Sequence, residues 1–171
     1  MHVWNSSGKR SKMNSFGLKH DFSVFNLIDV YDTGNIFISS QELLNYWFTR
    51  IEETIIEDTL PADIYLRRSP NSQNSRLTED AVLNLVTKGA MFWLVNNFET
   101  DEYIYPEGVQ NVRMLPNSKL LFEWFIIVHH VNYAKALVVR YDEAGIQRGV
   151  LITYPHAVKN LCDQLQQRIR N

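Results

Sequence analysis

The chain has 171 residues, 45% of them hydrophobic and 21% charged, and a formal net charge of −2 at pH 7. These values are typical of one soluble globular domain and exclude a general electrostatic attraction to nucleic acid or anionic membranes. Cys162 is the single cysteine, so we expect no internal disulfide and no cysteine-based metal site. A reducing cytoplasm is the expected location.

Residues 1–20 contain Ser, Asn, Gly and basic residues with little apolar periodicity. We therefore expect a flexible basic tail here, followed by a single domain over residues 21–171. An apolar stripe between Phe22 and Ile28 predicts a short helix at the start of this domain. No run in the sequence approaches the ~18 apolar residues that a membrane-spanning helix needs.

Residues 29–34 superficially resemble a calcium-binding loop. Tyr31 and Thr33 occupy two ligand positions, and Ser40 stands where the closing carboxylate should be. We therefore reject a calcium site and expect a turn around Gly34.

A capping box at residues 39–42 predicts the start of the clearest helix, because the Ser39 hydroxyl and the Glu42 carboxylate can satisfy free backbone N–H groups. The apolar face of this helix contains Leu43, Leu44, Trp47, Phe48, Ile51, Ile55 and Ile56. Pro61 ends the helix, since proline pushes the preceding residue out of the helical conformation.

A strand is predicted at residues 63–67, then a polar loop, then a helix with its cap at Thr78 and a left-handed end at Gly89. The apolar segment 90–95 predicts a second, central strand. Strand, helix and strand in this order indicate a parallel crossover connection. An acidic and aromatic segment, 99–108, follows these elements.

After a short strand at residues 109–115, the segments 120–128 and 133–141 predict an antiparallel hairpin at the centre of the sheet. Residues 129–132 are polar and separate the two runs. Glu123 interrupts the first run, and a buried carboxylate is costly unless it is paired or hydrogen-bonded. The favoured interpretation places it near the strand's start, reaching solvent or a backbone donor; alternatively, it orients a ligand or partner.

A glycine-containing turn at residues 142–145, a strand at 150–153 and a helix opening at Pro155 complete the chain. The predicted fold class is α/β (α+β mixed). We expect a single mixed sheet of about five to six strands, parallel in its first half and antiparallel in its second, with helices packed on it.

The ordered set of these segments resembles the DICT sensory-domain family, which is associated with diguanylate cyclases and two-component systems. The matching features are Glu123 next to Trp124, the strand 136–140, the Gly-Val-Leu-Ile-Thr segment 149–153 and the final helix. Upstream, residues 21–25, 40–44 and 51–52 are similar to the family's opening. The resemblance covers roughly residues 21 to 168.

This resemblance implies an input or sensory module in bacterial signalling, found beside photoreceptor-type, kinase or cyclase domains. The sequence shows no kinase or cyclase motif set, so we expect it to act in trans on a signalling protein. A tetrapyrrole attached at Cys162 would fit the photoreceptor association. However, Cys162 falls on the apolar stripe of the last helix, which disfavours both this attachment and nucleophilic catalysis.

The residues offer little for catalysis or metal binding. His129 and His130 are adjacent on a predicted strand and should point to opposite faces, so a metal site that includes them and His156 is disfavoured. Neither a glycine-rich phosphate loop nor a Gly-x-Ser-x-Gly motif is present. We therefore predict no enzyme activity, no metal and no cofactor.

Three hypotheses remain. The first is a non-enzymatic sensory domain that binds a small ligand or a protein partner, with Glu123 and Trp124 as binding residues and Arg140 as a salt partner on the neighbouring strand. The second is a ligand-free interaction adaptor that uses Trp4, the loop of Tyr103 and Tyr105, or a helix face. The third is an enzyme of unrecognised class. Monomer and homodimer fit the sequence equally.

Overall fold

The computed structural model describes seven stretches of the chain, which are residues 3–4, 10–11, 15–28, 34–68, 75–97, 107–145 and 147–170. The expected turn before Gly34, the loop after Arg68 and the acidic segment with Tyr103 and Tyr105 fall outside these stretches wholly or in large part. The side chain of Trp4 also lies outside the described part.

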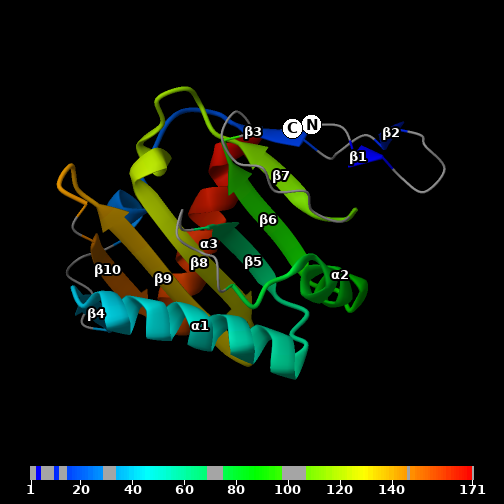
Figure 1. The fold of residues 1–171 in the computed structure, drawn as a ribbon, viewed down its shortest axis with the longest axis horizontal. Helices are drawn as coiled ribbons and strands as arrows, with labels where there is room; N and C mark the ends of the chain where they lie inside the picture. Colours follow the sequence, from blue (N-terminus) through cyan, green and yellow to red (C-terminus); the bar gives the residue numbers. More distant parts are fainter. Residues whose placement is uncertain are drawn as a thin grey trace.

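A nine-stranded mixed sheet forms the centre of the fold (Figure 1). Its order is β11 (Ile169–Arg170), β3 (Ser15–Leu18), β7 (Gln110–Arg113), β6 (Met91–Asn96), β5 (Asp63–Arg67), β8 (Glu123–His130), β9 (Tyr133–Tyr141), β10 (Gln147–Ile152) and β4 (Asn35–Ile38). A separate two-stranded ladder pairs β1 (Val3–Trp4) with β2 (Arg10–Ser11).

The predicted division of the sheet is confirmed. The neighbours β3, β7, β6 and β5 run parallel to one another. From β5 through β8, β9 and β10 to β4, every pairing is antiparallel. The number of strands is larger than expected, because the short strands β11, β3 and β4, at or next to the sheet's edges, were not recognised in the sequence.

Helices cover both faces of the sheet (Figure 1). One face carries α1 (Gln41–Asp58) and α2 (Glu79–Thr87), and the other carries α3 (Pro155–Arg168). The central strand β8 contributes to both cores: Trp124, Ile126 and Val128 face α1, whereas Phe125 and Ile127 face α3. This alternation explains why the apolar run of β8 is almost unbroken.

The helix ends follow from local side chains. The hydroxyl of Ser40, one residue after the expected cap Ser39, accepts a hydrogen bond from the Leu43 amide. Thr59 ends α1 in the left-handed conformation with φ 46°. Thr78 caps α2 as predicted, by accepting from the Ala81 amide.

Three details differ from the sequence-based expectations. The predicted short helix at residues 22–28 is a single 3-10 turn, η1 (Phe25–Leu27). The segment expected to be a tail contains β3, whose Leu18 is buried, so the sheet begins before residue 20. His129 continues β8, as does the next histidine, rather than belonging to the connecting loop.

The central hairpin aligns three charged residues at one end of the sheet. Glu123 of β8 pairs with Arg140 of β9, and Arg140 pairs with Arg148 of β10. Directly paired residues lie on the same face, and here this is the α3 face. No helix in the described part of the chain is long and apolar enough to cross a bilayer.

Candidate functional site

Glu123 is a buried carboxylate at the start of β8, with only 1% of the residue exposed. A 3-10 turn, η2 (Lys119–Phe122), directly precedes this residue. The Phe25 amide donates a 2.7 Å hydrogen bond to Oε1. The favoured sequence-based interpretation, a carboxylate near the strand's start that meets a backbone donor, is therefore confirmed.

The second oxygen of Glu123 is less well satisfied. Oε2 accepts no hydrogen bond from the described residues, and Nη2 of Arg140 lies 4.0 Å away. Burial raises the pKa of the Glu123 carboxyl above 4.5, although Ser23, the Phe25 amide and Arg140 each oppose the rise. Burying the Glu123 carboxylate therefore costs free energy, and the charge of Arg140 offsets only part of this desolvation cost.

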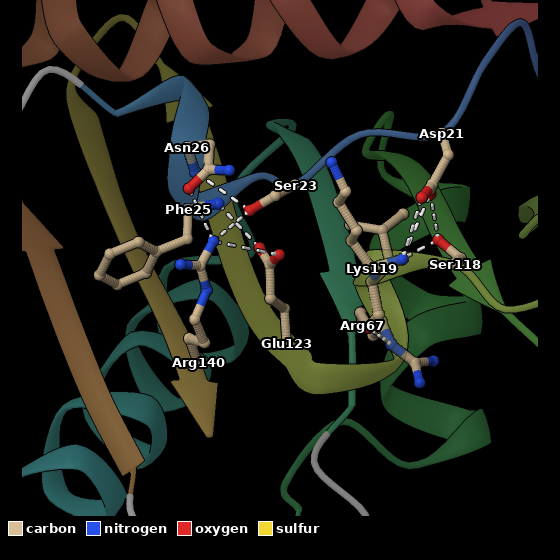
Figure 2. A network of polar contacts seen from close by, with 10 residues as sticks. Asp21, Ser23, Phe25, Asn26, Arg67, Ser118, Lys119, Glu123 and Arg140 are labelled. Carbon is tan, nitrogen blue, oxygen red and sulfur yellow. Dashed lines mark hydrogen bonds and ion pairs between the residues drawn. The ribbon is translucent and has the colours of Figure 1, made fainter. Parts of the chain in front are cut away.

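Arg140 connects Glu123 to the segment before β4. Its Nη2 donates hydrogen bonds to the Ser23 hydroxyl (2.6 Å) and to Oδ1 of Asn26 (2.8 Å). The guanidinium also lies over the Phe25 ring, 4.6 Å from its centroid. Figure 2 shows these side chains converging from β8, β9 and the η1 segment. The expected salt partner of Glu123, Arg140, lies within ion-pair distance, with 4.0 Å between Nη2 and Oε2.

Asp21 fixes the other end of the same segment (Figure 2). Its carboxylate accepts a 2.7 Å hydrogen bond from the Ser118 hydroxyl and also accepts from the Lys119 amide. The segment from residue 21 to 26 is therefore held at two points, by Asp21 and by the Glu123–Arg140 pair. This double attachment fixes the position of the Phe25 ring.

A pocket of about 500 Å³ opens beside Arg140. We call it the Arg140 pocket, and it is lined by Phe25, Phe37, Ile38, Ser39, Arg140, Asp142, Arg148 and Gly149. The lining comes from η1, from the junction of β4 and α1, and from the β9–β10 hairpin. Among the described residues Glu123 is not part of this lining, and it lies behind Arg140.

The structure separates the two adjacent residues that the sequence suggested as binding residues. Trp124 is 2% exposed and packs against α1, with its ring edge-on to Phe48 at 5.2 Å between centroids. Successive strand residues point to opposite faces, so Trp124 faces away from Glu123, Arg140 and the pocket. Its geometry is that of a core residue.

Of the eight residues that line the pocket, the sequence suggested only Arg140 as a site residue, and the missed ones include Phe25, Phe37 and Arg148. Phe25 was assigned to a helical stripe. Phe37 belongs to a four-residue strand. Its β-branched neighbours Ile36 and Ile38 favour a strand and could have indicated it. Arg148 precedes the predicted strand by two residues, at a position that its alternating pattern could have included.

The other candidate residues, those for metal binding and for nucleophilic catalysis, do not form a site. In the ranges that the structure describes, no group of three or more His, Cys, Asp or Glu residues could hold a metal ion. Cys162 is buried on α3 among apolar residues, as its place on the apolar stripe predicted. Burial raises the pKa of its thiol to about 12.

Comparisons with known proteins give no match: no family model, no curated protein and no solved structure matches this chain. The resemblance to the DICT family therefore stays a prediction. The function has to be inferred from the Glu123–Arg140 pair and the Arg140 pocket.

Proposed function

We propose that this chain is a non-enzymatic sensory or regulatory domain that binds a small ligand in the Arg140 pocket. The observation that carries the proposal is the pocket itself, whose volume of about 500 Å³ lies in the range typical of small-molecule sites. Its lining of apolar side chains with a few charged groups also fits this class of site.

The pocket's lining supports a regulatory role. Ser39 in its wall is adjacent to Ser40, which caps α1. Phe25 belongs to η1, and Arg148 belongs to β10. A ligand that contacts all three segments favours the conformations in which they lie close together, and this population shift can be passed to a partner through α1.

The polar contacts behind the pocket support ligand binding rather than catalysis. Glu123 uses one oxygen to hold the Phe25 amide and faces Arg140 with the other. A wall fixed before binding reduces the ordering cost of association. In this proposal Glu123 and Arg140 position the pocket wall, and Arg140 also contacts the ligand.

The resemblance to DICT sensory domains supplies the proposed context. It suggests a bacterial, sometimes light-linked, signalling pathway and a kinase, cyclase or photoreceptor-type protein as partner. The features that carry this likeness are Glu123 beside Trp124, the glycine-led strand β10 and the final helix.

Native mass spectrometry and an absorption spectrum of the full chain, purified from a bacterial host, test the proposal. We expect a mass above 20.0 kDa per chain that falls to the chain mass on denaturation. Ser39→Trp should fill the pocket and abolish the added mass, whereas the matched change Ser39→Ala should retain it. An added mass that survives Ser39→Trp contradicts the pocket as the binding site.

A second candidate is the ligand-free adaptor. Leu43 and Tyr46 are about half exposed on α1, at 50% and 56%, and exposed apolar side chains of this kind are found at protein interfaces. A colourless protein of chain mass that also binds no small molecule would favour this candidate. A pull-down with wild type and with the double variant Leu43→Ser, Tyr46→Ser would then test the α1 surface.

A further inference from the structure

We infer that the Arg140 pocket takes a small monocarboxylate with an aromatic or aliphatic body, whose carboxylate pairs with Arg148. The inference rests on the proposed function and specifies the chemical class of its ligand. Three observations support it: a guanidinium whose side chain has no partner among the described residues, a near balance of charge around the pocket, and an exposed phenylalanine in its apolar lining.

Arg148 is the uncommitted guanidinium. It is exposed on β10, directly paired with Arg140 of β9, and its side chain makes no hydrogen bond or ion pair with another described residue. Arg140, in contrast, already bonds Ser23 and Asn26 and lies over the Phe25 ring. A planar guanidinium with free donors matches a carboxylate in bidentate geometry.

The charge around the pocket favours an anion with a single charge. Arg140 and Arg148 bring two positive charges to the wall, and Asp142 brings one negative charge. Glu123 lies behind Arg140, with Oε2 at 4.0 Å from Nη2. With Glu123 included, the two positive and two negative charges sum to zero, so a bound dianion would leave a larger excess of negative charge than a monocarboxylate.

The apolar walls account for the body of the ligand. Phe37 is 59% exposed on β4, a strand at the edge of the sheet. Phe25, whose ring lies under the Arg140 guanidinium, and Ile38 add further apolar surface to the lining. A ring or short aliphatic chain in the pocket would cover the exposed Phe37 surface, which is favourable.

Isothermal titration calorimetry of the full chain tests the inference with phenylacetate, its neutral analogue phenylacetamide and the dianion phenyl phosphate. We expect phenylacetate to bind roughly 10- to 100-fold more tightly than phenylacetamide, which cannot form the charged pair. Phenyl phosphate should bind more weakly than phenylacetate, because the charges of Arg140, Arg148, Asp142 and Glu123 already sum to zero and its second negative charge would have no unbalanced partner.

Variants locate the binding. Arg148→Gln should weaken phenylacetate roughly 10-fold or more while leaving phenylacetamide unchanged. Arg113→Gln removes another exposed strand arginine, on β7, and serves as the matched control with unchanged affinity. Phe37→Ala should weaken both ligands alike. Both pocket residues are exposed, so circular dichroism of the variants should match wild type.

The results separate the two proposals. If phenylacetamide or phenyl phosphate binds as tightly as phenylacetate, and Ser39→Trp blocks it, the ligand class is wrong and the pocket remains a ligand site. If Arg148→Gln leaves phenylacetate affinity unchanged, the assignment of Arg148 is overturned. If no probe binds and the purified chain carries no added mass, both the ligand class and the proposed function fail.

Discussion

Nη2 of Arg140 lies 4.0 Å from Oε2 of Glu123. The two residues are directly paired, Arg140 on β9 and Glu123 on β8. The glutamate is buried, whereas the arginine side chain is 39% exposed, so the pair joins the sheet interior to the wall of a pocket. Through Ser23 and the Phe25 amide, the same two residues hold the η1 segment in place. The pair is thus the structural link between the core and the proposed ligand site.

Replacing Glu123 by glutamine should change how stability depends on pH. Burial raises the pKa of the folded carboxyl above 4.5, so between 4.5 and the raised pKa the folded chain holds more protons than the unfolded chain. Rising pH therefore lowers the free energy of unfolding of wild type in this window. Glutamine does not ionise, so Glu123→Gln should gain stability relative to wild type as pH rises.

Urea denaturation at several pH values between 4 and 8 measures this difference. The relative gain should amount to about 1.4 kcal/mol for each unit by which the pKa is raised. Glu52, whose pKa burial also raises, is present in both proteins and cancels in the comparison. A difference that stays constant over this pH range would show that Glu123 titrates normally in the folded chain.

Glu123→Ala should be more damaging than Glu123→Gln at every pH. Both variants remove the charged neighbour of Arg140, but alanine also leaves the Phe25 amide without its acceptor, whereas the glutamine oxygen can still accept this hydrogen bond. We expect Glu123→Ala to be less stable than Glu123→Gln by about 1–3 kcal/mol, by the same amount at pH 4 as at higher pH, because neither variant has a carboxyl at this position. Equal stabilities at pH 4 would mean that the Phe25 hydrogen bond contributes little.

Gly149 allows α1 to approach β10 closely. A Cβ built at this position would overlap Cδ2 of Leu44 and lie 3.3 Å from Cγ2 of Val139, and Leu44 is fully buried. Gly149→Ala should therefore destabilise the chain by about 1–3 kcal/mol. In a double-mutant cycle with Leu44→Ala, the two effects should be less than additive by roughly 1–2 kcal/mol. Strict additivity would exclude this contact as the cause.

Cys162 should be unreactive in the folded chain. Burial raises the pKa of the thiol to about 12, and the residue is 4% exposed on the inner face of α3. A thiol reagent such as dithionitrobenzoate at pH 8 should label the native protein at least about 100-fold more slowly than the urea-unfolded protein. Fast labelling of the native protein would restore Cys162 as a site for covalent attachment of a chromophore.

The central strands of the sheet were predicted well, because a long apolar segment can be recognised as a buried strand from the sequence alone. The strand β5 begins and ends as expected, and Thr78 caps α2 as expected. The short strands β3, next to one edge of the sheet, and β4, at the other edge, were missed, since four residues show too little periodicity. Their extended conformation depends on the ladders that they form with β7 and β10.

The candidate site could be predicted only in part. Glu123 and Arg140 were identified because a charge within an apolar strand requires a partner. Trp124, the next residue, packs into the core on the opposite face of the sheet. The alternation of side chains along a strand predicts this, but the sequence interpretation did not apply it to Glu123 and Trp124. Phe25, Phe37 and Arg148 meet only through tertiary packing, and no local motif connects them.

A crystallographic fragment screen of the full chain tests most directly whether the Arg140 pocket is a ligand site. The library should contain aromatic and aliphatic carboxylates together with neutral and cationic fragments of the same size. We expect fragments to lie between Phe25 and Phe37, with carboxylates paired to Arg148. Fragments that bind elsewhere while this pocket stays without density would contradict the proposed function.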